Sequence, residues 1–168
     1  MIQKKICMLG SFAVGKTSLV RRFVHSMFTD KYLTTVGVKI DNKKLVYGDK
    51  EISLLLWDLY GEDEFQRVQT SYLRGSSGLL LVADGTRPET VDKAIELRDK
   101  TVTSLGNIPY LLLMNKCDLA PQWEVSPERL RQLAQSGWRI LHTSAKTGEG
   151  VEQSFVSITA MMMGGATK

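Results

Sequence analysis

Several features that mark other protein classes are scarce or missing in this sequence. No apolar run approaches the ~18 residues of a membrane-spanning helix, and Met1–Lys4 has neither an apolar signal stretch nor a glycine after the methionine. The net charge is only +4, and the basic residues are scattered in pairs instead of forming a stripe. We therefore expect no integral membrane association and no nucleic-acid partner.

Cysteine is also scarce. The two cysteines, Cys7 and Cys117, fall in an expected strand and in a separate motif, where their thiols would not meet. This placement favours a reducing compartment, and we expect the protein in the cytoplasm. The 168 residues are 43% hydrophobic and 24% charged, with no repeat or linker. A single domain, residues 1–168, is expected to fold around one core.

Short apolar runs alternate with helical patterns along the chain. The runs, bounded by glycine, aspartate or proline as in strands buried on both faces, are Lys5–Leu9, Ser53–Leu59, Gly78–Asp84, Tyr110–Asn115 and Arg139–Thr143. The helical patterns are Lys16–Phe28, Glu62–Leu73, Glu89–Leu105, Pro127–Ser136 and Gly150–Met163. Val36–Tyr47 and Glu51–Leu59 are too close together for a crossover, so they should pair antiparallel. The expected fold is α/β: a doubly wound, mostly parallel six-stranded sheet with one antiparallel strand and about five helices.

The most specific motif is a phosphate-binding loop. Residues 10–17 read GSFAVGKT, a complete GxxxxGK[ST] pattern between an expected strand and an expected helix. In such a loop the backbone N–H groups converge on a phosphate, Lys16 adds a point charge, and the Thr17 hydroxyl can ligate Mg²⁺. The residues expected to contact a nucleotide here are Ser11, Phe12, Ala13, Val14, Gly15, Lys16, Thr17 and Ser18.

Three further motifs follow expected strands, at the edge where doubly wound sheets bind their ligands. Asp58-Leu59-Tyr60-Gly61 offers a carboxylate for Mg²⁺ and a glycine N–H for a γ-phosphate. Asn115-Lys116-Cys117-Asp118 offers a carboxylate that accepts hydrogen bonds from guanine but is repelled by the N1 acceptor of adenine. Ser144-Ala145-Lys146 follows the last strand. The four motifs together predict one site for GTP or GDP with Mg²⁺, and they argue against a P-loop kinase or ATPase that uses an adenine nucleotide.

With these motifs the chain resembles a small GTPase of the Ras superfamily, and Trp57-Asp58, Thr35-Val36-Gly37-Val38 and Tyr72-Leu73-Arg74-Gly75 look most like the Rab branch. The resemblance implies the P-loop NTPase fold of small GTPases and hydrolysis of GTP to GDP and phosphate. The base site that it implies consists of Phe28, Asn115, Lys116, Asp118, Ser144, Ala145 and Lys146, with the Ala145 backbone donating to the guanine oxygen. Mg²⁺ would be held by Thr17, Thr35 and Asp58, the γ-phosphate would meet Gly61, and Lys16, Thr35 and Glu62 would take part in catalysis.

The resemblance also implies two switch loops, Thr29–Val36 and Leu59 to about Tyr72, which would bind an effector, an exchange factor and an activating protein. The effector surface would include Lys39–Leu45, with Ile40, Trp57 and Tyr72 at its centre; packing of the two aromatic residues against the sheet is an equally weighted alternative.

Three departures from the family pattern concern hydrolysis. Glu62 stands where the family usually has a glutamine, and an ionised glutamate accepts hydrogen bonds but cannot donate them. Phe12 stands where the family has a small residue, and Leu59-Tyr60 replaces Thr-Ala. We expect slow hydrolysis, with two alternatives: Glu62 as an unusual general base helped by an arginine, or a module that holds guanine nucleotide permanently and does not cycle.

The chain ends at Lys168 without the cysteine that Ras and Rab proteins usually prenylate. We expect either that a longer tail has been trimmed or that the protein works without a lipid anchor.

Overall fold

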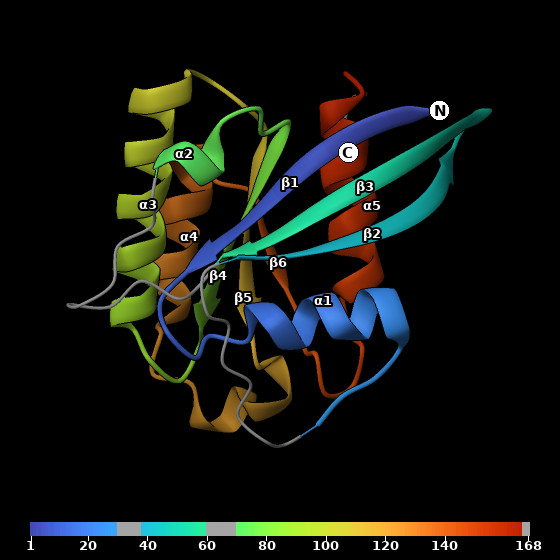
Figure 1. Ribbon diagram of the computed structural model, residues 1–168. Helices are drawn as coiled ribbons and strands as arrows, with labels where there is room; N and C mark the ends of the chain where they lie inside the picture. The colour runs from blue at the N-terminus through green and yellow to red at the C-terminus, as the bar shows by residue number, and fades with distance from the viewer. Residues whose placement is uncertain (30–37, 60–69, 166–168) are drawn as a thin grey trace.

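The computed structural model describes residues 1–29, 38–59 and 70–165. Six strands form one sheet in the order β2-β3-β1-β4-β5-β6 (Figure 1). Their bounds are β1 Ile2–Gly10, β2 Val38–Tyr47, β3 Lys50–Leu59, β4 Gly78–Asp84, β5 Tyr110–Asn115 and β6 Ile140–His142. Every neighbouring pair is parallel except β2 with β3. The expected mixed sheet, with one antiparallel strand at its edge, is confirmed.

Helices cover both faces of this sheet (Figure 1). The α-helices are α1 Lys16–His25, α2 Thr70–Leu73, α3 Glu89–Leu105, α4 Pro127–Gln135 and α5 Val151–Met162, and a 3₁₀ helix, η1, spans Cys117–Gln122. On one face, α1 and α5 pack together, and the rings of Phe23 and Phe155 stack with centroids 3.9 Å apart. On the other face, Val91 and Leu97 of α3 join Leu133 of α4 in a second buried cluster. Among the described residues, no helix is both long enough and apolar enough to cross a bilayer.

One end of helix α1 and one end of strand β1 each differ by three residues from the sequence-based expectation, and one helix was not expected. Helix α1 ends at His25 and not at Phe28, because Ser26 takes a left-handed conformation (φ 54°) and its N–H bonds to the carbonyls of Arg21 and Arg22. Strand β1 begins at Ile2, three residues before the apolar run, because its first residues pair with β3 from Ile52 onward. The helix η1 was not expected, since Pro121 lies within it.

The parallel strands all point the same way, so their carboxyl ends meet at one edge of the sheet. Strand β1 ends at Gly10, β3 at Leu59, β4 at Asp84, β5 at Asn115 and β6 at His142. Each of the four predicted motifs starts at or next to one of these ends. The two cysteines are both free, Cys7 buried and Cys117 half-buried.

Candidate functional site

The phosphate-binding loop connects β1 to α1, and its carbonyl groups are hydrogen-bonded one after another. Lys16 Nζ donates to the carbonyl oxygens of Gly10 (3.3 Å) and Ser11 (3.2 Å). At the other end, the Leu19 N–H donates to the carbonyl of Gly15 (2.9 Å), which starts the regular bonding of α1. The three carbonyls between them are held from outside the loop.

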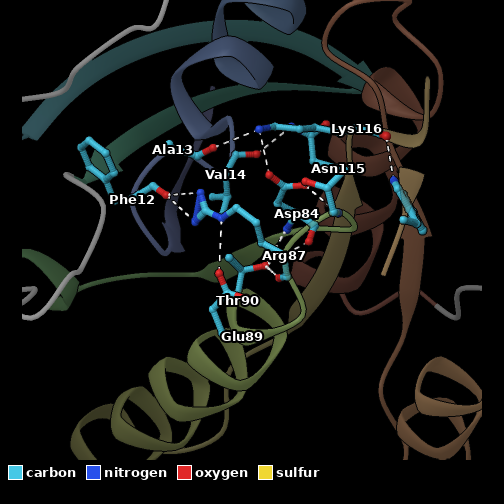
Figure 2. Close-up of polar contacts among 11 residues, drawn as sticks. Phe12, Ala13, Val14, Asp84, Arg87, Glu89, Thr90, Asn115 and Lys116 are labelled. Carbon is cyan, nitrogen blue, oxygen red and sulfur yellow. Dashed lines mark hydrogen bonds and ion pairs between the residues drawn. The ribbon is translucent and has the colours of Figure 1, made fainter. Parts of the chain in front are cut away.

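Side chains from the β4–α3 connection and from the end of β5 hold these three carbonyls (Figure 2). The guanidinium of Arg87 donates twice to the carbonyl of Phe12, at 2.9 and 2.7 Å. Lys116 Nζ donates to the carbonyl of Ala13 at 3.2 Å, and Asn115 Nδ2 donates to the carbonyl of Val14 at 2.9 Å.

This bonding determines where the loop directs its N–H groups. In a trans peptide the carbonyl and the following N–H point in opposite directions, and the described part of the chain has no cis peptide bond. Holding the carbonyls of Phe12, Ala13 and Val14 outward therefore turns the next three N–H groups inward. Successive N–H groups converging in this way form an anion-binding concavity. Gly15 has φ 104°, and a Cβ there would lie 2.3 Å from Asn115 Nδ2, so the position requires glycine.

Lys16 is the buried cation of this loop, with 6% of its surface exposed. Burial lowers its pKa to about 8, the charge of Asp58 opposes this shift, and Arg87 adds to it. A buried ammonium group is costly unless it is paired, and the oxygens of a phosphate would supply both charge and hydrogen bonds.

Two of the predicted metal ligands, Thr17 and Asp58, offer the oxygen atoms that Mg²⁺ prefers. The Thr17 hydroxyl donates to Asp58 Oδ2 at 2.5 Å, which brings two hard oxygen ligands together beside the loop. In the described ranges, no group of three or more His, Cys, Asp or Glu side chains could hold a metal. Mg²⁺ is usually bound by few protein oxygens, with waters and phosphates completing its shell, so this pair suffices. The third predicted ligand, Thr35, lies outside the described residues, as do Gly61 and Glu62.

The predicted base readers lie on the loops that follow β5 and β6. Asp118 is exposed at the start of η1, and Ser144 Oγ donates to its Oδ1 at 2.8 Å. Asn115 is buried, and its Oδ1 accepts from Thr143 Oγ1 at 3.1 Å. The Cys117 N–H donates to the Thr143 carbonyl at 2.9 Å. The structure thus brings the Asn115–Asp118 and Ser144–Lys146 motifs together, with the carboxylate of Asp118 open to a ligand.

The Ser144–Lys146 loop is itself held by α1. Arg22 Nε donates to the Ala145 carbonyl at 2.7 Å, and its Nη2 donates to the Lys146 carbonyl. The Ser144 carbonyl accepts from the Gly148 N–H at 2.8 Å, which turns the Ala145 N–H away from that bond. Phe28, the predicted base stacker, follows the end of α1 with 37% of its surface exposed.

Sequence reasoning missed four residues that support the site: Arg22, Asp84, Arg87 and Trp123. Asp84 is buried at the end of β4, and Lys116 Nζ lies 2.8 Å from its Oδ2. Burial alone would raise the pKa of Asp84, but hydrogen bonds from Lys116 and Thr86 outweigh burial and hold the pKa below its ordinary value. A carboxylate at the carboxyl end of a buried strand was the available signal for Asp84. No motif marks the two arginines.

The comparisons with known proteins agree with this geometry. The Ras family model matches residues 5–164. The chain is 36% identical to human Ras-related protein Rab-3A over 153 residues, which are 90% of this chain and 70% of that protein. It is 35% identical to mouse Ras-related protein Rab-21 over 161 residues, which are 95% of this chain and 72% of that protein. The chain therefore belongs to the Ras family, as a GTP-binding small GTPase of the Rab branch.

Proposed function

We propose that the protein is a molecular switch that binds GTP and GDP with Mg²⁺ and hydrolyses GTP slowly. The observation that carries this proposal is the series of outward-held carbonyls at Phe12, Ala13 and Val14. Ser11, Gly15 and Ser18 would complete the phosphate contacts. Lys16 would bind the β- and γ-phosphates, and Thr17, Asp58 and Thr35 would hold Mg²⁺, which neutralises phosphate charge.

Guanine selectivity would come from Asp118. Its carboxylate can accept from both N1–H and the exocyclic amine of guanine, while Ser144 keeps one of its oxygens oriented. Asn115 and Lys116 reach the phosphate-binding loop, so the same segment that reads the base also supports the phosphate cradle. Base and phosphate binding are coupled through β5.

Slow hydrolysis is proposed because of Glu62 and Phe12. Glu62 cannot donate a hydrogen bond to the phosphoryl oxygens when ionised. Phe12 is 45% exposed, and Figure 2 shows its ring pointing away from Arg87. A bulky ring at this position would crowd an arginine that an activating protein brings in, and such an arginine is worth roughly 10³–10⁵ in rate.

The switch loops would report the bound nucleotide to an effector, an exchange factor and an activating protein. The departure at Glu62 also motivates a second function, a module that holds guanine nucleotide permanently and does not cycle. Both functions need guanine binding, and they differ only in turnover.

The decisive experiment identifies the nucleotide that remains bound after purification and measures single-turnover GTP hydrolysis, with and without candidate activators. Slow but finite turnover supports the switch. Bound nucleotide with no turnover supports the non-cycling module, and equal binding of ATP and GTP would overturn both.

Two substitutions test the switch itself. Lys16→Ala should remove most affinity for GDP and GTP alike. Thr35→Ala should leave GDP affinity nearly unchanged and weaken only GTP binding, because its hydroxyl is expected to bind Mg²⁺ in the GTP state. Equal losses for both nucleotides in Thr35→Ala would show that residues 29–36 are not a switch.

A further inference from the structure

Arg87 is an arginine of the chain itself that contacts the phosphate-binding loop. Its two guanidinium hydrogen bonds to the Phe12 carbonyl join the β4–α3 connection to the loop across 75 residues of sequence (Figure 2). Neither Asn115 nor Lys116 can take over this role, because each already donates to a different carbonyl of the loop.

The peptide group that Arg87 holds has two ends. Its carbonyl belongs to Phe12 and its N–H belongs to Ala13, and in a trans peptide they point in opposite directions. With the carbonyl turned out toward Arg87, the Ala13 N–H turns into the concavity of the loop. Ala13 has φ 63°, in the left-handed region that a residue with a Cβ rarely adopts. Such a conformation persists only where its surroundings impose it.

Arg87 is well placed to impose it, because its own backbone is fixed at the start of α3. Its N–H donates to the Asp84 carbonyl at 2.9 Å, and its carbonyl accepts from Thr90 Oγ1 at 2.7 Å. Its Nε lies 3.6 Å from Glu89 Oε1. The guanidinium is therefore oriented by the Phe12 carbonyl on one side and by the Glu89 carboxylate on the other. Its positive charge lies on the side of the loop toward which the Phe12 carbonyl points.

We propose that Arg87 is a positioning residue for the phosphates of the bound nucleotide. It holds the Phe12–Ala13 peptide so that the Ala13 N–H donates to a phosphate oxygen beyond the α-phosphate. This inference rests on the proposed binding of guanine nucleotides and extends it to a residue outside the four motifs.

The test compares the affinities of the purified protein for GDP and GMP, because GMP lacks the β-phosphate. Arg87→Ala should lower the ratio of GDP to GMP affinity about tenfold, the typical effect of losing hydrogen bonds to a charged group. Arg87→Lys should recover part of the loss, since an ammonium group can make one of the two bonds. Arg131→Ala is the matched control, because it removes an arginine from the exposed surface of α4 and should leave the ratio unchanged.

A merely structural role would lower the GDP and GMP affinities by the same factor and leave their ratio unchanged. An unchanged ratio, with or without a loss of affinity, would therefore overturn the proposal. If Arg87→Ala does not fold, Arg87→Gln offers the same comparison, because its amide can make only one bond to the Phe12 carbonyl. If the unsubstituted protein fails to prefer guanine nucleotides, the proposed function is wrong, and not only the role of Arg87.

Discussion

The indole of Trp123 lies directly against the α-carbon of Gly85. A Cβ at position 85 would lie 2.0 Å from Trp123 Cε2. The indole also stacks on His142 with centroids 5.3 Å apart, and its Nε1 donates to the Lys116 carbonyl at 2.8 Å. Lys116 has φ 69°, a left-handed conformation at the turn that leads to Asp118. Trp123 therefore supports the turn that leads to Asp118, the proposed guanine reader, and Gly85 leaves the space that the indole needs.

We expect Gly85→Ala to displace Trp123 and lower the free energy of unfolding by about 2 kcal/mol, the typical cost of overpacking. Guanine-nucleotide affinity should fall several-fold in the same variant. Trp123→Leu should also destabilise the protein, and Gly85→Ala should add little in the Trp123→Leu background, since the obstructing ring is gone. Urea unfolding of the four proteins measures this coupling, and strictly additive losses would show that the two positions act separately.

Asp84 predicts a pH dependence of stability. Its folded-state pKa lies below the ordinary 3.8, so its ionised form stabilises the fold above that pH, and this contribution is lost as the pH falls through the folded-state pKa. Asp84→Asn should lower the free energy of unfolding by about 2 kcal/mol at pH 7, and this difference should shrink below pH ~4. Asp99→Asn on the exposed side of α3 is the control and should have little effect. A constant difference across the pH range would assign the loss to packing and not to charge.

Base selectivity is expected to depend on Asp118. Asp118→Asn replaces a carboxylate that accepts two hydrogen bonds with an amide that can also donate, which suits xanthine better than guanine. The variant should shift preference from GDP toward xanthosine diphosphate by roughly 10⁴-fold. Its Oδ1 can still accept from Ser144, so the turn should remain folded. Competition binding measures the shift, and an unchanged preference would show that Asp118 does not face the base.

The residues of the predicted effector surface differ in burial. Ile40 pairs with Trp57 across β2 and β3 and is 49% exposed, whereas Trp57 and Tyr72 are half-buried against the core on the α3 face. Lys5 Nζ lies 3.6 Å from the Trp57 ring centroid and donates to the Tyr72 carbonyl at 2.7 Å.

We therefore expect Tyr72→Ala to lower the free energy of unfolding by about 2 kcal/mol, part of the cost of truncating a fully buried aromatic residue. Ile40→Ala should change it little. Thermal unfolding of both variants measures this contrast. If Tyr72→Ala is as stable as Ile40→Ala, the ring is not needed for packing and is available to a partner.

The fold could be predicted because its signals are local. Each buried strand of the parallel sheet is a short apolar run, and Ser126 with Pro127 marks the start of α4, where Ser126 Oγ accepts from the Arg129 N–H at 3.1 Å. The first residues of β1 carried no such signal, because Gln3 and Lys4 are polar and form a strand only by pairing with β3.

Lys16, Thr17 and Asp118 could be proposed as site residues from the sequence because a phosphate, a metal ion and a base each demand particular residue types. The supports of the site were not predictable, because they depend on contacts between distant segments. Arg22 and Arg87 act through hydrogen bonds to backbone carbonyls, which any residue provides, so no sequence pattern accompanies them. Trp123 and Gly85 meet because the residues that follow η1 lie against those that follow β4, where the Gly85 carbonyl also accepts from the Glu124 N–H at 2.9 Å.

Glu62 and Phe12 are expected to limit GTP hydrolysis together. We expect Glu62→Gln alone to raise GTP turnover little, because Phe12 would still obstruct an incoming arginine. Phe12→Gly with Glu62→Gln should restore a measurable rate in the presence of an activating protein, more than the sum of the single effects. Arg87, which lies beside the phosphate-binding loop, already bonds to the Phe12 carbonyl and is held by Glu89. Single-turnover assays of the four proteins measure the coupling. If the unsubstituted protein already hydrolyses GTP as fast as an ordinary small GTPase, the obstruction does not exist, and Glu62 or an arginine within the chain serves as the catalytic group.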